Sequence, residues 1–224
     1  MILLVPAGHF NCVPASRHRE GSRGRAQVRS RDPNPISLTS LAIPIPLTQI
    51  MNDARARGYE LKIIDIGGGF PVPYDSRVPQ FEKLAGIINA ECERLFPQDV
   101  ELIAEPGRFM VATAAVLVSE IVGKARRDGK IFYYINDGVY QTFSGVVYDH
   151  WIPNFHSFKS GPAEVCAVVG PTCDSFDKIS LSEQLPGDLQ IGDFLYTENI
   201  GAYSIASSTK FNGFEGAKIL HLNN

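Results

Sequence analysis

The sequence Leu61-Lys62-Ile63-Ile64-Asp65-Ile66-Gly67-Gly68-Gly69-Phe70-Pro71 joins a short apolar run to three consecutive glycines. The run 61–66 is rich in β-branched residues and is bounded by chain-breaking residues, which predicts a buried strand. Glycine adopts positive φ freely and leaves its N–H group uncovered, so glycines after a strand can form a nest of amides for an anion such as phosphate. A simple tight turn is the alternative interpretation.

A second segment, Glu101-Leu102-Ile103-Ala104-Glu105-Pro106-Gly107-Arg108, repeats this design. It is again a short predicted strand that ends in a polar, glycine-containing loop, and it places Glu105 three residues before Arg108. In barrels of alternating strands and helices, such loops gather at one rim and build the active site. The pair of segments therefore favours an anion-binding rim, with a structural ion pair between Glu105 and Arg108 as the alternative.

Size and charge limit the classes of function. The 224 residues are enough for one large or two small domains, and a formal net charge of −3 gives no indication of a nucleic-acid partner. No apolar run approaches the roughly 18 residues that a membrane span needs. The cysteines are scattered and form no CxxC pair, which argues against a zinc site or a disulfide framework and favours a reduced, cytoplasmic setting. They are Cys12, Cys92, Cys166 and Cys173.

The chain is predicted to have three parts. Residues 1–46 crowd arginines and prolines without a helical or strand period, which predicts an irregular N-terminal segment outside the fold, such as a misread gene start. A transit peptide or a basic patch for an anionic partner are the alternatives. Residues 47–108 follow an α-β-α-β order, with helices expected near 49–58 and 79–96, and this order is typical of a parallel sheet.

The remaining residues, 109–224, change character. A short helix is expected at 109–115, and strand-like runs follow it, separated by Gly-Pro and Gly-Asp dipeptides. These runs are 116–122, 130–135, 164–169 and 193–197. Their spacing predicts a mostly antiparallel β domain at the C-terminal end of the chain.

Six motifs, in one order, carry a resemblance to a known family. They are Ile64-Asp65-Ile66-Gly67-Gly68-Gly69-Phe70-Pro71, Ala104-Glu105-Pro106-Gly107-Arg108, Asn136-Asp137-Gly138-Val139-Tyr140, Tyr148-Asp149-His150, Gly170-Pro171-Thr172-Cys173-Asp174-Ser175-Phe176-Asp177 and Glu198-Asn199-Ile200-Gly201-Ala202-Tyr203. From about residue 49 onward, the chain resembles the C-terminal part of the ornithine decarboxylase family, the group IV pyridoxal-phosphate decarboxylases. The resemblance implies an α/β fold: the last two strands of a (β/α)8 barrel of alanine-racemase type, followed by the β domain.

The resemblance also implies a cofactor, pyridoxal 5'-phosphate. Glu105 would face the pyridine nitrogen and keep it protonated, which makes the ring an electron sink. Arg108 and the Tyr203 hydroxyl would contact the phosphate, although a tyrosine in such a turn usually only packs. The residues implied to bind the cofactor are Gly67, Gly68, Gly69, Glu105, Gly107, Arg108 and Tyr203.

For the substrate, the resemblance implies a dibasic amino acid. Cys173 would be the active-site cysteine that directs protonation after CO2 is lost. Asp174 and Asp149 would hold the distal ammonium, because an unpaired buried charge is unfavourable. Tyr140 would lie at the interface near this pocket, since the family's active site is shared across a two-fold homodimer.

Two further residues have alternative roles, and a third is expected in the core. For Asp177 and His150, a solvated or capping role is the alternative to a role in the site. Cys166 lacks a polar setting and is predicted to lie in the core, as most lone cysteines do.

One departure from the family's pattern bears on activity. A segment like Pro-x-x-Ala-x-Lys, which carries the cofactor-linking lysine, does not occur in the sequence. The chain is therefore expected to be truncated, inactive alone and poorly soluble. The leading hypothesis is a decarboxylase of ornithine, with lysine left open. The alternatives are a non-catalytic regulatory homologue of a polyamine enzyme and a diaminopimelate decarboxylase.

Overall fold

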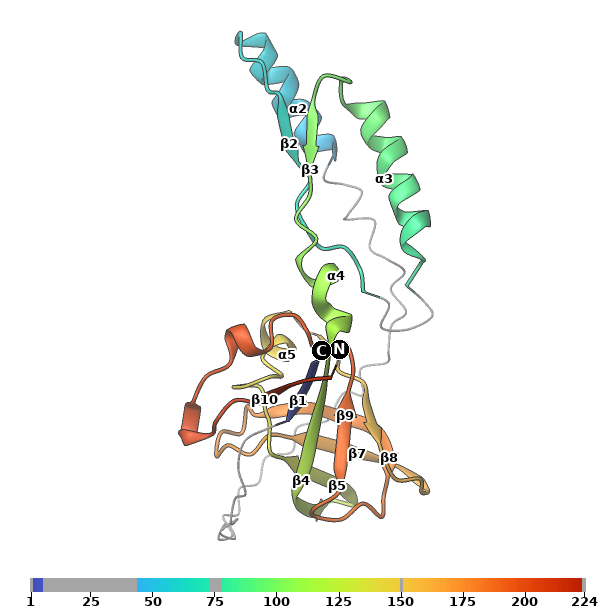
Figure 1. Ribbon diagram of the computed structural model, residues 1–224, viewed down its shortest axis with the longest axis vertical. Coiled ribbons are helices and arrows are strands. Elements are labelled where there is room, and N and C mark those ends of the chain that lie inside the picture. Colours follow the sequence, from blue (N-terminus) through green and yellow to red (C-terminus); the bar gives the residue numbers. More distant parts are fainter. Residues whose placement is uncertain (1, 6–43, 73–77, 150, 223–224) are drawn as a thin grey trace. The chain divides into compact units, whose positions relative to one another are not determined.

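The computed structural model describes residues 2–5, 44–72, 78–149 and 151–222 (Figure 1). The arginine-rich stretch lies outside these residues, as do Cys12 and His150. The described residues divide into two compact units, one formed by residues 44–109 and the other by residues 2–5 and 110–222. They are called the helical unit and the β domain, and each is described by itself.

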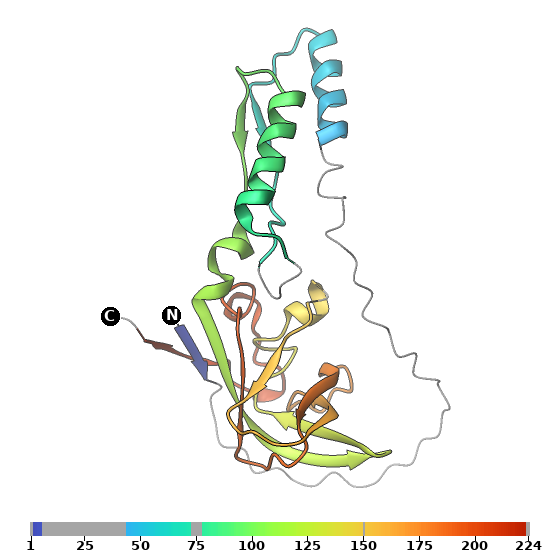
Figure 2. The ribbon, with the colours of Figure 1, turned by 90° about the vertical axis from the view of Figure 1, so that its right-hand side faces the viewer.

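The helical unit has the α-β-α-β order that the sequence predicts. Its elements are α2 (Pro44–Ala56), β2 (Ile63–Asp65), α3 (Phe81–Leu95) and β3 (Glu101–Ile103). Strands β2 and β3 pair in parallel, and Figure 2 shows α3 running alongside them. Pro97 follows α3 and prevents its continuation. These two strands do not form a closed barrel among the described residues, so the barrel assignment stays a proposal.

The core of the helical unit is small. Its buried residues are Met51, Ile64, Cys92 and Phe96. The apolar face predicted for α3 is only partly covered: Ile88 and Leu95 pack against this core, whereas Phe81 and Ile87 remain 43% and 41% exposed. Apolar side chains of β2 and β3 are also open to solvent, with Ile63 56% exposed.

The β domain is a sheet that curls into a near-barrel (Figure 1). Its strands are β1 (Ile2–Val5), β4 (Ala115–Arg127), β5 (Lys130–Ile135), β6 (Phe155–Ser157), β7 (Ala163–Val169), β8 (Lys178–Pro186), β9 (Phe194–Thr197) and β10 (Lys218–His221). The short α4 (Gly107–Val111) contains the last residues of the helical unit and the first residues of the β domain along the chain, and α5 (Gly145–Tyr148) belongs to the β domain. The strand order is β10-β1-β4-β5-β7-β8, and β9 pairs with β4 and β6.

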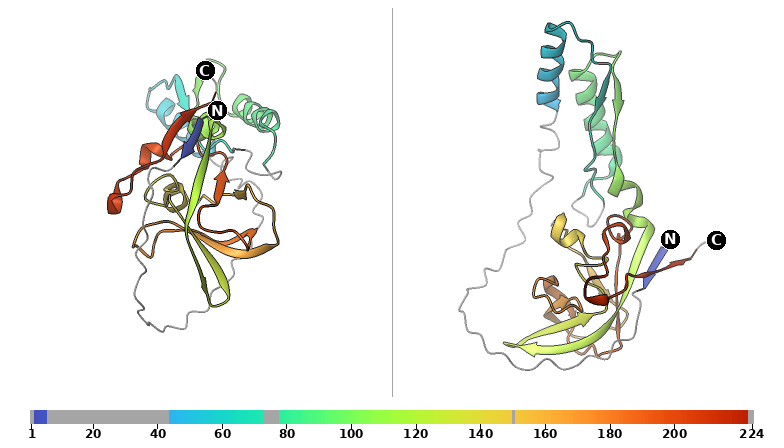
Figure 3. Two further views of the ribbon diagram at one scale, coloured as in Figure 1. Left: turned by 60° about the horizontal axis from the view of Figure 1, so that its bottom comes forward. Right: turned by 90° about the vertical axis from the view of Figure 1, so that its left-hand side faces the viewer.

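Most pairings in this sheet are antiparallel, as predicted. The parallel ones among the described strands are β1–β4 and β5–β7. Residues expected to be irregular contribute to regular structure at both ends of segment 1–46, because Ile2–Val5 forms β1 and α2 begins at Pro44. The short run Ile-Leu-Leu-Val has no period of its own. It is a strand because β4 and β10 offer hydrogen bonds on its two sides, and Figure 3 shows it between them.

Alternation along the strands builds the core of the β domain. From Ala115 to Ile121, every second residue of β4 is buried, as expected for a strand with one face inward. Residues from most of the strands meet inside, together with Phe143 from the segment before α5. The largest fully buried side chains are Tyr133, Phe143, Leu117, Ile121, Ile131, Ile135, Leu185, Leu189, Leu195, Ile200 and Gln141.

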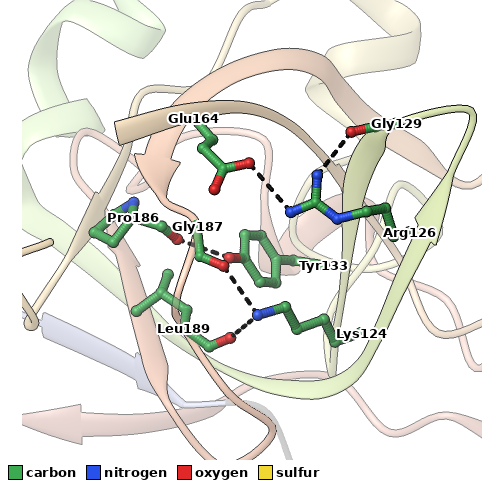
Figure 4. A network of polar contacts seen from close by, with 8 residues as sticks. All are labelled: Lys124, Arg126, Gly129, Tyr133, Glu164, Pro186, Gly187 and Leu189. Carbon is green, nitrogen blue, oxygen red and sulfur yellow. Dashed lines mark hydrogen bonds and ion pairs between the residues drawn. The ribbon is translucent and has the colours of Figure 1, made fainter. Parts of the chain in front are cut away.

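A polar network ties the β4–β5 hairpin to the loop after β8 (Figure 4). The Lys124 ammonium donates hydrogen bonds to the carbonyl oxygens of Gly187 and Leu189, at 3.0 and 2.7 Å. The Tyr133 hydroxyl donates to the Pro186 carbonyl at 2.7 Å, and burial raises the pKa of this phenol to about 12. The network thus fixes one end of the near-barrel.

Candidate functional site

The glycine loop after β2 and the loop after β3 are joined through their backbones. The Glu105 amide donates to the Gly67 carbonyl at 2.8 Å. A Cβ atom on Gly68 would lie only 2.5 Å from the Glu105 carbonyl oxygen, so this close approach requires glycine. Gly67 and Gly69 have φ of +73° and +79°, which also favour glycine. The two loops predicted to share a rim are therefore adjacent.

The polar groups of this rim suit an anion in part. The Gly67 amide donates to Asp65 Oδ1 at 2.8 Å, so it is already engaged. The Gly68 and Gly69 amides donate to no described residue. Arg108 is the second residue of α4 and is half-buried, while Glu105 is exposed. Phe109 packs on Phe81 with ring centroids 4.7 Å apart, which fixes the backbone next to Arg108.

The loop between β7 and β8 carries the predicted cysteine. Cys173 is exposed, and its Sγ and backbone N–H both donate to Asn212 Oδ1 at 3.3 Å. Asn212 has a φ of +57°, and an Asn-Gly pair is a common sequence for such a backbone. Cys166 is fully buried in β7, as predicted, and burial raises its pKa to about 11.

Asp174 and Tyr140 form a direct pair beside Cys173. The Tyr140 hydroxyl donates to Asp174 Oδ2, and the Phe176 amide donates to Asp174 Oδ1 at 2.9 Å. The Tyr140 hydrogen bond, followed by the Phe176 bond, lowers the pKa of Asp174. The same contact with Asp174 raises the pKa of Tyr140 to about 12. At neutral pH the pair is therefore a phenol bound to a carboxylate, with one negative charge.

The segment after Tyr203 supports this pair. Phe211 stacks on the Tyr140 ring with centroids 4.3 Å apart. The Thr209 amide and hydroxyl donate to the Tyr140 carbonyl at 2.8 and 2.9 Å. Thr209, Phe211 and Asn212 are not predicted by the sequence, because they lie beyond Tyr203, in a segment without one of the six motifs. The Asn-Gly pair at 212–213 was the available signal for a turn.

Tyr203 and Asp149 belong to two other segments of the β domain. Tyr203 has a φ of +53° and is 55% exposed, and its carbonyl accepts hydrogen bonds from Ser144 Oγ and Ser207 Oγ at 3.1 and 2.7 Å. Asp149 follows α5 and is exposed. The structure thus groups Cys173, Asp174 and Tyr140, while Gly67 to Gly69, Glu105, Gly107 and Arg108 belong to the other unit.

Asp137 and Asp177 are buried beside these loops. Asp137 accepts hydrogen bonds from the Gly138 amide, the Thr142 amide and the Thr142 hydroxyl at 2.7, 2.9 and 2.7 Å. Burial is nevertheless the dominant influence and raises the pKa of Asp137 to about 7. Asp177 is 3% exposed, so the solvated role considered for it is wrong. None of the described residues form a cluster suited to a metal ion.

Comparison with known proteins identifies the family. Residues 27–201 match the model of the pyridoxal-dependent decarboxylase C-terminal sheet domain. The chain belongs to this family. The near-barrel of the β domain agrees with a sheet domain of this type, and the resemblance drawn from the six motifs is confirmed. No described helix has both the length and the apolar character that crossing a membrane would require.

The relatives include a protein named as an inhibitor and an enzyme. Antizyme inhibitor 2 of Xenopus laevis is 40% identical over 197 residues, which cover 77% of this chain and 43% of the relative. The ornithine decarboxylase of Schizosaccharomyces pombe is 35% identical over 187 residues, covering 78% and 42%. The chain therefore spans less than half the length of these relatives.

A solved structure of the same kind is the Vibrio vulnificus lysine/ornithine decarboxylase complexed with putrescine. It is 37% identical, with a TM-score of 0.70 over 80% of this chain and 48% of that one. Another relative has been solved in complex with PLP and cadaverine. The family is thus pyridoxal-phosphate-dependent, and members of it bind diamines.

Proposed function

We propose that the chain is part of a pyridoxal-phosphate-dependent decarboxylase of ornithine, with lysine as the close alternative. The observation that carries the proposal is the arrangement of the exposed Cys173 beside the Asp174–Tyr140 pair. This arrangement offers a thiol and a fixed negative charge side by side. The solved relatives that bind putrescine and cadaverine support a substrate whose far end is an ammonium group.

The charge of Asp174 supports a dibasic amino acid as the substrate. Its lowered pKa keeps the carboxylate ionised, so it can form a charge-assisted hydrogen bond with an ammonium. Diaminopimelate carries a second carboxylate at its far end, which Asp174 would repel. In this proposal, Asp149 supplies a second acidic contact to the same ammonium, and Cys173 delivers a proton after CO2 leaves.

The loops of the helical unit fit pyridoxal phosphate in the groups they present. The Gly68 and Gly69 amides and Arg108 would hold the phosphate, with the Tyr203 hydroxyl as a further donor. Glu105 is exposed and would hold the proton on the pyridine nitrogen. When bound, this cofactor supplies the electron sink for decarboxylation. A two-fold dimer, with the glycine loops from one subunit and the cysteine loop from the other, is part of the proposal.

Diamine binding tests the substrate assignment without requiring turnover. Cadaverine, putrescine and diaminopimelate are titrated into the chain by calorimetry, with butylamine as a monoamine reference. The Asp174→Asn variant should bind the diamines about tenfold or more weakly, because it loses a charge-assisted hydrogen bond of roughly 1.5–3 kcal/mol. The matched control is Asp128→Asn, which changes an exposed turn residue. Unchanged diamine affinity in Asp174→Asn, or tighter binding of diaminopimelate, would overturn the assignment.

The relation to antizyme inhibitor 2 supports a second candidate, a non-catalytic regulatory homologue of a polyamine enzyme. Retention of Cys173 and Asp174 favours the enzyme, since a regulator has no need of either residue. Diamine binding that depends on Asp174 separates the two functions, and co-purification with the antizyme is the accompanying measurement. A regulator should retain the antizyme in both the wild type and Cys173→Ala, and should show no diamine binding that depends on Asp174.

A further inference from the structure

We propose that Asp177 is a positioning residue that holds the turn carrying Tyr140 against the loop carrying Cys173 and Asp174. The two segments are 137–144, which follows β5, and 170–177, which joins β7 to β8. The Tyr140–Asp174 pair can form only if these segments keep a fixed separation. The Asp177 carboxylate lies between them and bonds to both.

The hydrogen bonds of Asp177 are divided between the two segments. Oδ1 accepts from the Val139 amide at 2.9 Å, one residue before Tyr140. Oδ2 accepts from the Thr172 amide at 3.1 Å and the Thr172 hydroxyl at 2.8 Å, one residue before Cys173. The Asp177 carbonyl also accepts from the Gly170 amide at 2.9 Å. A single buried side chain therefore fixes both neighbours of the candidate site.

Two glycines make room for this carboxylate. A Cβ atom on Gly138 or on Gly170 would collide with the carboxyl group of Asp177. Neither glycine has a positive φ, so space rather than backbone conformation requires glycine at both positions. By contrast, Asp137 bonds only within the Tyr140 turn, to Gly138 and Thr142, and does not link the two segments.

This positioning role can be measured without turnover. The binding of a substrate ammonium by the Tyr140–Asp174 pair rests on the proposed function. The geometry of the pair is independent of that function. Tyr140 itself reports the contact, since its pKa is about 12 beside Asp174 against an ordinary value of 10.0. A failure of diamine binding would therefore contradict the proposed function but not the positioning role of Asp177. A failure of the Tyr140 measurement would contradict the positioning role but not the proposed function.

The experiment follows the ionised fraction of Tyr140 at pH 10.5 by NMR of ring-labelled tyrosine, with Tyr140→Phe to assign the signal. In the wild type, Tyr140 should be almost fully protonated. Asp174→Asn sets the other limit, in which a phenol near its ordinary pKa is roughly three-quarters ionised. Asp177→Asn should approach this limit for two reasons: an amide nitrogen cannot accept the bonds that one carboxylate oxygen accepts, and the substitution removes the Asp177 charge, which also raises the pKa of Tyr140. Asp128→Asn should match the wild type.

Thr172→Val separates position from charge. It removes one hydrogen bond to Asp177 and keeps the carboxylate, so an ionised fraction between the two limits is expected. The Cys173 thiol should also react faster with a disulfide reagent at pH 7.5 in both variants, with Cys173→Ser as the background. A wild-type ionised fraction in Thr172→Val would overturn the proposal, even if Asp177→Asn failed to fold. A lower Tm in Asp177→Asn with Tyr140 still protonated would reduce Asp177 to a structural role.

Discussion

Asp137 is an acid that the β domain buries almost completely. Three donors surround it, yet burial in a medium of low polarity disfavours its charged form and raises its pKa to about 7. Its pKa in an unfolded chain is about 3.9. At pH values between these two pKa values, the folded state therefore holds a proton that the unfolded state has lost. Stability contributed by this group falls as pH rises from about 4 to about 7.

Asp137→Asn should remove this dependence. The amide oxygen can accept the two backbone N–H bonds, and the amide nitrogen can donate to the Thr142 hydroxyl, so the three contacts survive. We expect the variant to have a higher Tm than the wild type at pH 8, with a difference in unfolding free energy that shrinks by up to about 1.4 kcal/mol per pH unit toward pH 5. Thermal melts across this range check it. A difference that does not vary with pH would contradict the assignment of the proton to Asp137.

Asn212 restrains the thiol of Cys173. Asn212→Gly keeps a residue suited to a φ of +57° but removes the acceptor, whereas Asn212→Ala also strains the backbone. Both variants should label faster at Cys173 with a thiol reagent, and only Asn212→Ala should lower the Tm, by a few degrees. Equal labelling rates in Asn212→Gly and the wild type would show that the 3.3 Å contacts do not restrain the thiol.

At this scale the sequence pointed to residues that the structure places together, and their roles stay predictions. The motifs pointed to Cys173, Asp174 and Tyr140, and the structure brings them together. The supporting residues Phe211 and Asn212 could not be found, because they are more than 30 residues further along the chain and belong to a segment without strand or helix periodicity. Only the fold shows that this segment returns to Tyr140.

Among the elements, the loops after β2 and β3 depend on one another. Gly68→Ala would place a Cβ atom 2.5 Å from the Glu105 carbonyl oxygen, and a backbone atom cannot move aside without shifting the loop. We expect the helical unit to lose roughly 1–3 kcal/mol of stability, as overpacking usually costs. Unfolding in urea, followed by hydrogen exchange of β2 and β3, measures this loss.

Gly86→Ala is the matched control. Gly86 lies within α3, and its added methyl group would meet no atom within 4 Å. A helix interior favours alanine over glycine, so this variant should gain roughly 0.4–1 kcal/mol. The same chemical change should thus have opposite signs at the two positions. Equal changes in unfolding free energy at the two positions would show that the close contact between Gly68 and Glu105 does not affect stability.

Elements with a strong local pattern were predicted well, and the others were not. The expected run 130–135 coincides with β5, and the expected helix 79–96 contains α3. Strand β8 was missed, because Lys178–Pro186 mixes serine and glutamate with few apolar residues. Its place comes from pairing with β7, and this kind of tertiary contact leaves little trace in local composition.

For the whole molecule, the two units differ in the size of their cores. Four buried residues form the core of the helical unit, and sixteen form the main core of the β domain, counted over the described residues. Local stability follows buried apolar area, so the helical unit should open first. Hydrogen exchange should show fast exchange in β2 and β3 and slow exchange in β4, β5 and β7. Uniform protection across both units would contradict this order.

Exposed apolar side chains on β2 and β3 should limit solubility. Ile63 and Ile103 are 56% and 41% exposed, and such residues on strands with open edges favour association. The double variant Ile63→Thr with Ile103→Thr keeps the β propensity and should reduce light scattering at a given concentration. Phe158→Thr, which changes a 65% exposed residue of the β domain, is the control and should have a smaller effect.

The asparagine that holds Cys173 is followed by Gly213, and this dipeptide is the one most prone to spontaneous deamidation in ageing proteins. The reaction needs the Gly213 amide nitrogen to attack the asparagine side chain. In the folded domain that amide donates to the Lys210 carbonyl at 2.9 Å, and the side-chain oxygen is held by Cys173. Folding thus protects Asn212 from its own neighbour. A stored sample would accumulate aspartate or isoaspartate there only as fast as the loop opens, and each conversion would set a new carboxylate beside the thiol.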